Sequence, residues 1–278
     1  MAKIPNDKYY TPQHIVSRCI DTIIETIGLD KITEVIEPSA GNGAFMHDER
    51  LHVDYAYDIL PEAEDIIQAD YLEIAKTLQY KPGRLVLGNP PFGYAGNLYN
   101  QFYKASVKIA DYVAFILPIS QLNSNIRLYE FDLIKSIDLG DCEYSGRKIR
   151  CCFNIYTRPQ SGILNKMPKT KKLKSIIISI VEFRKNVQCR GVKNFQPDFN
   201  FCMWGAKIGK QIPISKRMAK CLLIKINNEE YIERFKDFEF ELKKGKCGTP
   251  SISLYEAVKQ IHDRLNIPYE EETIETLF

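Results

Sequence analysis

The fold of this chain is decided by residues 84–93, which read RLVLGNPPFG. The apolar run at the start of this stretch is typical of a short buried strand. Because two adjacent prolines cannot continue a strand, Pro90 and Pro91 predict a stiff turn directly after it. That turn presents Asn89 and Phe92 at the carboxyl end of the strand, which is the edge where open α/β sheets bind ligands.

The chemistry of this turn suits a planar ring that carries an amino group. Asn89 offers an amide oxygen as an acceptor, Pro90 offers a carbonyl held in a fixed direction, and Phe92 offers an aromatic face. Two acceptors and a stacking surface match such a ring. Taken alone, these residues are also compatible with a rigid strand-to-helix turn that binds nothing.

A second ligand-type turn follows a strand expected at residues 33–37, where residues 37–45 read EPSAGNGAF. Gly41 and Gly43 allow the backbone to turn sharply and to lie close to a ligand. We expect a helix to begin after this loop, since the exposed N–H groups of a helix start favour a carboxylate or phosphate.

Three consecutive strand ends deliver a carboxylate, namely Glu37, Asp58 and Asp70. Any one of them could cap a helix, but three at one sheet edge favour a ligand site. Asp58 follows Gly43 at a spacing similar to that of the acid that binds ribose hydroxyls in nucleotide-binding folds.

The alternation of strands and helices predicts an α/β fold with a doubly wound sheet. We expect helices near residues 15–27, 72–78, 98–110 and 253–265, and further strands at 53–57, 67–69, 111–118 and 150–156; residues 126–139 are ambiguous. In such a sheet the first strand is central and the fourth lies beside it across the switch point. The glycine loop and residues 89–92 would then share one crevice.

The composition is that of a globular protein: 278 residues, 45% apolar and 26% charged. No apolar run approaches the roughly 20 residues that span a bilayer, and the N-terminus has no hydrophobic signal core, so we expect an intracellular protein with no membrane association. The eight cysteines form no Cys-x-x-Cys pair and no histidine lies between residues 53 and 261. This spacing excludes a zinc finger, and we expect no metal and reduced cysteines.

The charge is unevenly distributed. Residues 158–250 hold 21 Lys and Arg against 8 Asp and Glu, whereas the rest of the chain holds 17 and 27. A basic segment joined to an acidic one suggests a polyanionic partner for the basic part.

Together, residues 37–45 and residues 89–92 resemble the S-adenosylmethionine-dependent adenine-N6 methyltransferases that act on DNA. The Tyr10-Thr11-Pro12 triplet looks like their N-terminal cofactor motif. The motif order looks like the gamma arrangement of restriction–modification systems and viruses. The resemblance covers residues 8–158 and implies a Rossmann-like catalytic domain over residues 1–158. Residues 159–278 would form a basic target-recognition region that ends in a helix.

The resemblance implies S-adenosyl-L-methionine as cofactor, with Asp58 on its ribose, Ile59 on its adenine and Asp70 on its amino group. The full implied cofactor set is Tyr10, Thr11, Glu37, Ser39, Ala40, Gly41, Gly43, Asp58, Ile59, Asp70, Tyr71 and Asn89. The implied catalytic set is Asn89, Pro90, Pro91 and Phe92. Tyr71 stands where the family often has Phe, and Asn42 stands where many members have Asp.

The implied partner is double-stranded DNA with a flipped-out adenine, bound by a monomer in a bacterial or phage-host cytoplasm or in virus-infected cells. A separately encoded restriction endonuclease is a further implied partner. The candidate nucleic-acid-binding residues are Phe153, Lys169, Lys171, Lys172, Arg190, Lys193, Trp204 and Lys207.

Three alternatives stay open at the level of the sequence. An RNA adenine methyltransferase and a protein glutamine methyltransferase share the Asn-Pro-Pro-aromatic motif, and a decayed methyltransferase fold could serve as a non-catalytic nucleic-acid-binding module. The basic region after the core favours a nucleic acid over a protein substrate, and the intact Asn89, Phe92 and Asp58 argue against decay.

Overall fold

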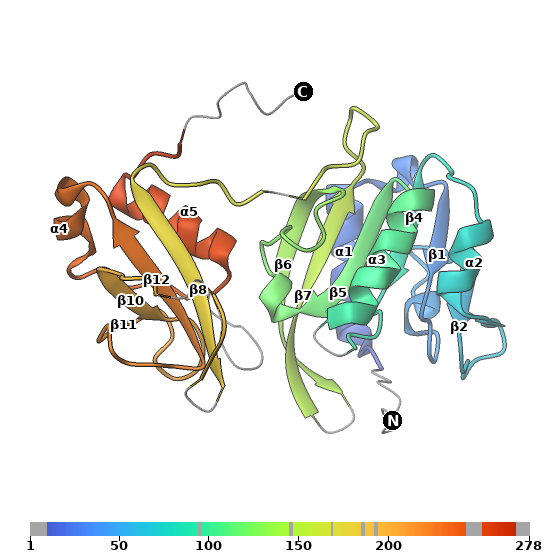
Figure 1. Cartoon of the computed structure of the whole chain (residues 1–278). Helices are drawn as coiled ribbons and strands as arrows, with labels where there is room; N and C mark the ends of the chain where they lie inside the picture. Colours follow the sequence, from blue (N-terminus) through green and yellow to red (C-terminus); the bar gives the residue numbers. More distant parts are fainter. Residues whose placement is uncertain are drawn as a thin grey trace. The chain divides into compact units, whose positions relative to one another are not determined.

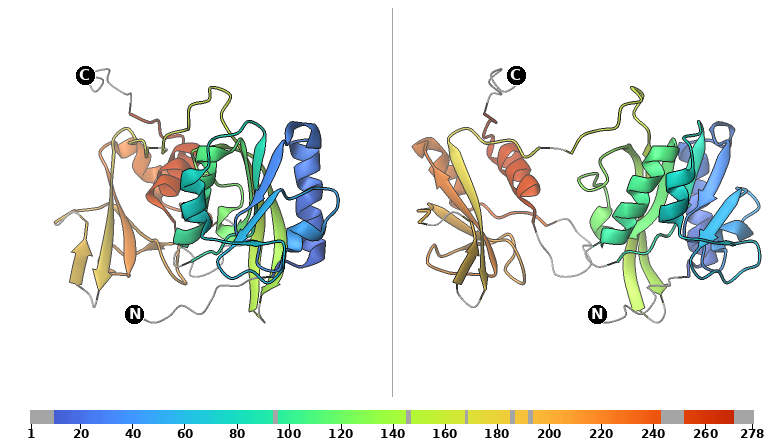
Figure 2. Two further views of the ribbon diagram at one scale, coloured as in Figure 1. Left: turned by 90° about the vertical axis from the view of Figure 1, so that its right-hand side faces the viewer. Right: turned by 45° about the vertical axis from the view of Figure 1, so that its right-hand side comes forward.

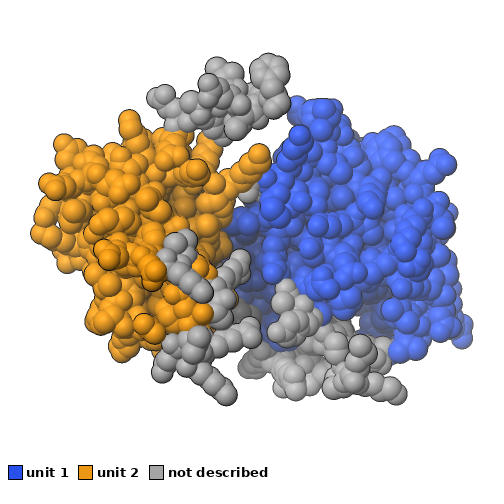
Figure 3. Space-filling view, viewed as in Figure 1, with its two compact units in different colours: residues 1–168 blue, residues 169–278 orange. Residues whose placement is uncertain are grey.

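The computed structural model describes residues 10–93, 96–144, 147–167, 169–184, 187–191, 194–242 and 252–270. The chain divides into two compact units, residues 1–168 and 169–278 (Figure 3), which we call unit 1 and unit 2. The sequence placed this boundary after residue 158.

Within the described residues, unit 1 has a seven-stranded sheet in the order β3-β2-β1-β4-β5-β7-β6 (Figure 1). The strands are β1 (Glu34–Glu37), β2 (Tyr55–Asp58), β3 (Ile67–Gln68), β4 (Arg84–Gly88), β5 (Tyr112–Pro118), β6 (Asp132–Tyr144) and β7 (Arg147–Thr157). The first five are parallel to one another, and β7 runs antiparallel to both β5 and β6. β1 lies between β2 and β4, so the doubly wound sheet and its switch point are confirmed.

Helices cover both faces of this sheet: α1 (Gln13–Thr26) on one face, α2 (Tyr71–Thr77) and α3 (Asn97–Ile109) on the other, as the left view of Figure 2 shows. Successive residues of β4 serve opposite faces. Leu85 and Leu87 pack in the core that contains α1, and Val86 packs in the core that contains α3. This is why the strand reads as a continuous apolar run rather than an alternating one.

One local expectation was wrong. After Gly43 the chain forms only a 3₁₀ turn, η2 (Ala44–His47), before it extends again at Asp48. Two further 3₁₀ turns are η1 (Leu29–Lys31) and η4 (Ile119–Gln121).

Unit 2 has a five-stranded antiparallel sheet in the order β11-β10-β12-β8-β9 within the described residues. The strands are β8 (Ile176–Arg184), β9 (Val187–Arg190), β10 (Phe199–Cys202), β11 (Gln211–Ile212) and β12 (Lys220–Ile226). η5 (Glu229–Tyr231), α4 (Ile232–Phe235) and α5 (Leu254–Leu265) follow. Ser253 and Glu256 form a capping box that starts α5, so the expected final helix is confirmed.

None of the described helices combines the length and apolar character needed to cross a bilayer.

β1 begins at a buried ion cluster. Glu34 accepts hydrogen bonds from Lys81 Nζ at 2.6 Å and from Arg84 Nε, and Arg84 also donates to the carbonyls of Gln79 and Ile109. Burial alone would raise the pKa of Glu34, but the hydrogen bonds from Lys81 and Arg84 outweigh it and lower the pKa. The cluster therefore stabilises the fold through the ionised carboxylate.

We predict that Glu34→Gln lowers the free energy of unfolding at pH 7 by about 3 kcal/mol, because Arg84 is left buried without its carboxylate. Since folding lowers the pKa of Glu34, this stabilisation is present above the unfolded value of about 4.3 and is lost as the pH falls through the folded value. Urea unfolding at several pH values measures both effects.

Glu73→Gln is the matched control, because the Glu73–Lys76 pair has side chains 68% and 67% exposed. It should cost less than about 1 kcal/mol. Equal costs for the two variants would contradict the role of the buried cluster.

Candidate functional site

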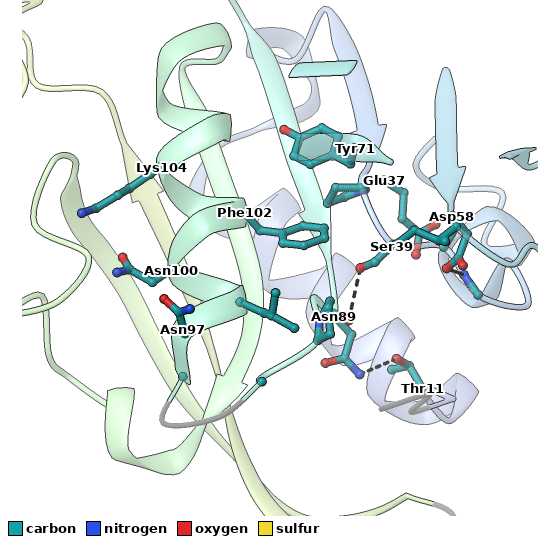
Figure 4. A pocket seen from close by; sticks show the side chains of 18 of the residues that line it. Thr11, Glu37, Ser39, Asp58, Tyr71, Asn89, Asn97, Asn100, Phe102 and Lys104 are labelled. Carbon is teal, nitrogen blue, oxygen red and sulfur yellow. Dashed lines mark hydrogen bonds between the residues drawn. The ribbon is translucent and has the colours of Figure 1, made fainter. Parts of the chain in front are cut away.

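Three segments that are far apart in the sequence meet at Asn89, at the switch point (Figure 4). The Ser39 hydroxyl, from the turn after β1, donates to the backbone carbonyl of Asn89 at 3.3 Å. The side-chain nitrogen of Asn89 donates to the Thr11 hydroxyl at 3.2 Å. The expected shared crevice is therefore present. With its nitrogen turned to Thr11, the Asn89 amide directs its oxygen the other way, toward α3 (Figure 4).

The glycine loop is fixed to the end of β2 by Asp58. The two carboxylate oxygens of Asp58 accept from the backbone N–H groups of Gly41 and Leu60, each at 2.8 Å. Gly41 and Gly43 have φ values of +57° and +78°, which favour glycine. A carboxylate has four acceptor positions, so Asp58 can hold the loop and still accept from a ligand.

A pocket of about 1060 Å³ opens at this edge of the sheet. The sequence-predicted residues that line it are Tyr10, Thr11, Glu37, Ser39, Ala40, Gly41, Asp58, Ile59, Tyr71, Asn89 and Pro91. Ile59 is 61% exposed and lines the pocket, so its apolar side chain is accessible to a ligand. The structure thus brings most of the predicted cofactor residues to one cavity.

Four predicted residues do not line the pocket: Gly43, Asp70, Pro90 and Phe92. Asp70 caps α2, where its side chain accepts from the backbone N–H of Leu72. The Phe92 ring packs edge-on to Tyr99, with 6.5 Å between the centroids.

Of the candidate nucleic-acid-binding residues, Phe153 is a correction. It is 0% exposed and packs in the core that contains α1, because β7 is an interior strand between β5 and β6. It cannot offer a stacking face.

The remaining candidates lie in unit 2. Trp204 is 46% exposed, Arg190 ends β9, and Lys193 lies outside the described residues. The exposed lysines are Lys169, Lys171, Lys172 and Lys207.

Glu37, at the other end of β1 from Glu34, is 2% exposed and lines the pocket. Among the described residues, no donor reaches its Oε2 atom. Burial, and then the nearby charge of Asp58, raise the pKa of Glu37 well above its usual range. A buried acceptor of this kind requires a cationic or N–H-bearing ligand to become satisfied.

Sequence reasoning missed the part of the pocket that α3 and the loop between η4 and β6 supply. Asn97, Asn100 and Lys104 line it from one face of α3, and Ile126, Arg127, Tyr129 and Met167 also line it. The signal was a polar i, i+3, i+7 spacing in the helix that directly follows residues 89–92. Phe102 lines the pocket from another face of α3 and stacks on Tyr71 at 5.6 Å.

In the described part of the chain, no group of three or more His, Cys, Asp or Glu side chains is arranged to hold a metal ion.

No protein-family model and no curated protein matches the chain. Among solved structures it is similar to a putative RNA methyltransferase from Pyrococcus horikoshii, at 16% identity and a TM-score of 0.44, over 56% of this chain and 90% of that one. It is also similar to a putative class I S-adenosylmethionine-dependent methyltransferase from Listeria monocytogenes, at 13% identity and a TM-score of 0.44, over 60% and 66%.

A third similar structure is the M protein of the type I restriction enzyme EcoKI, at 12% identity and a TM-score of 0.41, over 59% of this chain and 47% of that one. Similarity at these levels carries no conclusion about activity, which must come from the geometry of the pocket.

For Glu37 we predict a change in the free energy of unfolding opposite in sign to the change predicted for Glu34. Glu37→Gln should raise the free energy of unfolding of the ligand-free protein at pH 7 by about 1–3 kcal/mol, because it removes a carboxyl group that folding must either protonate or bury as an unpaired charge. Since folding raises the pKa of Glu37, the gain grows as the pH rises above the unfolded value of about 4.3 and vanishes below it. Loss of stability at pH 7 in urea unfolding would contradict this account.

Proposed function

We propose that this protein transfers a methyl group from S-adenosyl-L-methionine to the N6 amino group of an adenine in DNA. The observation that carries the proposal is the Asn89 amide. Asn89 lines the pocket with its nitrogen tied to Thr11 and its oxygen directed toward α3, beside an acidic cradle at the carboxyl ends of β1 and β2.

The residues of the cradle fit this cofactor. S-adenosylmethionine carries an ammonium and a sulfonium, and the pocket offers the carboxylates of Glu37 and Asp58 at this end. The unsatisfied Oε2 of Glu37 suits the ammonium, Asp58 has acceptor positions left for ribose hydroxyls, and exposed Ile59 offers an apolar surface for the adenine ring. When bound there, the cofactor supplies an electrophilic methyl group.

In this proposal Asn89 and Pro90 supply the hydrogen-bond acceptors that would make the N6 nitrogen of adenine more nucleophilic. The N6 nitrogen is a poor nucleophile because its lone pair is conjugated into the ring. Hydrogen bonds from its two N–H groups to the Asn89 amide oxygen and the Pro90 carbonyl would favour a pyramidal nitrogen with an available lone pair. Catalysis of this kind rests on positioning and charge stabilisation, and it needs no covalent intermediate.

The tie between Ser39 and the Asn89 backbone fixes where these acceptors stand. The hydroxyl of Ser39 donates to the backbone carbonyl of Asn89, and the side-chain nitrogen of Asn89 donates to the hydroxyl of Thr11. The amide of Asn89 cannot rotate its nitrogen toward the substrate without breaking the bond to Thr11. It is therefore preorganised as an acceptor.

The exposed lysines of unit 2 and its excess of basic residues support a nucleic acid as the substrate. In duplex DNA the adenine would have to be flipped out of the stack, at a cost of about a few kcal/mol. In this proposal the Phe92 ring, which packs edge-on to Tyr99 and does not line the pocket, would have to turn toward the base to offset part of that cost by stacking. A separately encoded endonuclease would complete a restriction–modification pair.

We predict that Asn89→Ala lowers kcat for transfer of labelled methyl from S-adenosylmethionine to genomic DNA by about 10²–10³-fold or more, because it removes an acceptor that acts on the reacting nitrogen. Binding of duplex DNA should largely survive.

Asn165→Ala is the control, since this asparagine of unit 1 lies outside the pocket and bonds to Asp132. Equal transfer rates for wild type and Asn89→Ala would overturn the proposed role.

A further inference from the structure

We infer that the pocket holds a second subsite, which binds the nucleotide that flanks the target adenine. We call it the α3 subsite and define it by Asn97, Asn100 and Lys104 of α3 with Arg127 and Tyr129 of the loop between η4 and β6. The inference rests on the proposed function and names where the polynucleotide enters the pocket.

The first argument is size. Pockets for one small molecule commonly measure about 300–1000 Å³, and this one measures about 1060 Å³. The residues assigned to the cofactor and to the Asn89 acceptor occupy only part of its wall. The α3 subsite supplies a further part, on the face of α3 that is turned away from Phe102 (Figure 4).

The second argument is charge. The acidic side chains that line the cofactor end are Glu37 and Asp58, whereas the basic side chains of the α3 subsite are Lys104 and Arg127. An acidic end suits a cationic cofactor, and a basic end suits the phosphate of a polynucleotide. Lys104 forms no ion pair with any of the described residues.

The third argument is an unsatisfied acceptor. The side-chain oxygen of Asn100 is buried and has no hydrogen-bond partner in the described structure, although the residue lines the pocket. A buried amide left in this state favours a ligand with N–H or O–H donors, as a base edge or a sugar has. Tyr129 adds a ring on which a base can stack.

The loop that carries Arg127 is positioned for this role. Its guanidinium donates to the hydroxyl of Tyr99 at 3.2 Å, which ties the loop to α3.

Lys104→Ala and Lys108→Ala form a matched pair, because both lysines are exposed on α3 and only Lys104 lines the pocket. The probe is a short fluorescein-labelled oligodeoxyadenylate, which offers adenines without the cost of flipping. Its affinity is measured by anisotropy on the full chain, so the assay needs no methyl transfer. Binding of S-adenosylmethionine is measured by calorimetry.

Lys104→Ala should weaken oligodeoxyadenylate binding about threefold to tenfold and reduce the salt slope of log K by about 0.7, the value for one contact with a single strand. Lys108→Ala and Lys104→Arg should both stay within about twofold of wild type, and the affinity for S-adenosylmethionine should not change.

Equal losses in the two alanine variants, or a parallel loss of cofactor affinity in Lys104→Ala, would overturn the α3 subsite. Failure of the wild type to bind S-adenosylmethionine would instead overturn the proposed function, and the oligodeoxyadenylate result would stand separately.

Discussion

The site depends on the two hydrogen bonds that hold Asn89, one from Ser39 to its backbone carbonyl and one from its side chain to Thr11. They join the turn after β1, the turn after β4 and the segment before α1. The sheet makes these bonds possible, because β1 and β4 are parallel neighbours whose carboxyl ends lie side by side. The hydrogen bond to Thr11 also orients the side-chain amide of Asn89, and this orientation decides whether its oxygen can accept from a substrate.

The two glutamates of β1 have opposite effects on stability, and only the second lines the pocket. Glu34, at the start of the strand, is satisfied by Lys81 and Arg84 and stabilises the fold as an anion. Glu37, at the end, is buried beside Asp58 with an unsatisfied oxygen, so its ionisation destabilises the ligand-free protein. A cationic or N–H-bearing ligand would offset that cost. Functional sites commonly show such local departures from good packing and pairing.

Much of unit 1 could be predicted from the sequence, because strand ends, glycine turns and helix starts are local signals. The glycine loop, the turn at Asn89 and their meeting across the switch point all follow from such signals. Long-range packing decides the rest. The sequence suggested Phe153 as a stacking residue, but β6 pairs with β7 and makes it an interior strand, so Phe153 is buried. The residues from the loop around Arg127 reach the pocket through long-range packing, and Arg127 bonds to Tyr99 of α3 there.

The central claim is that Asn89 presents a nucleobase amino group to a methyl donor in the adjoining acidic cradle. The most direct measurement is nucleoside analysis after incubation of the protein with methyl-labelled S-adenosylmethionine and either genomic DNA or total RNA. The account predicts label in N6-methyladenine from DNA. Label in N6-methyladenine from RNA alone would keep the chemistry and change the polymer. No label in any nucleoside, with DNA and RNA both present, would contradict the account.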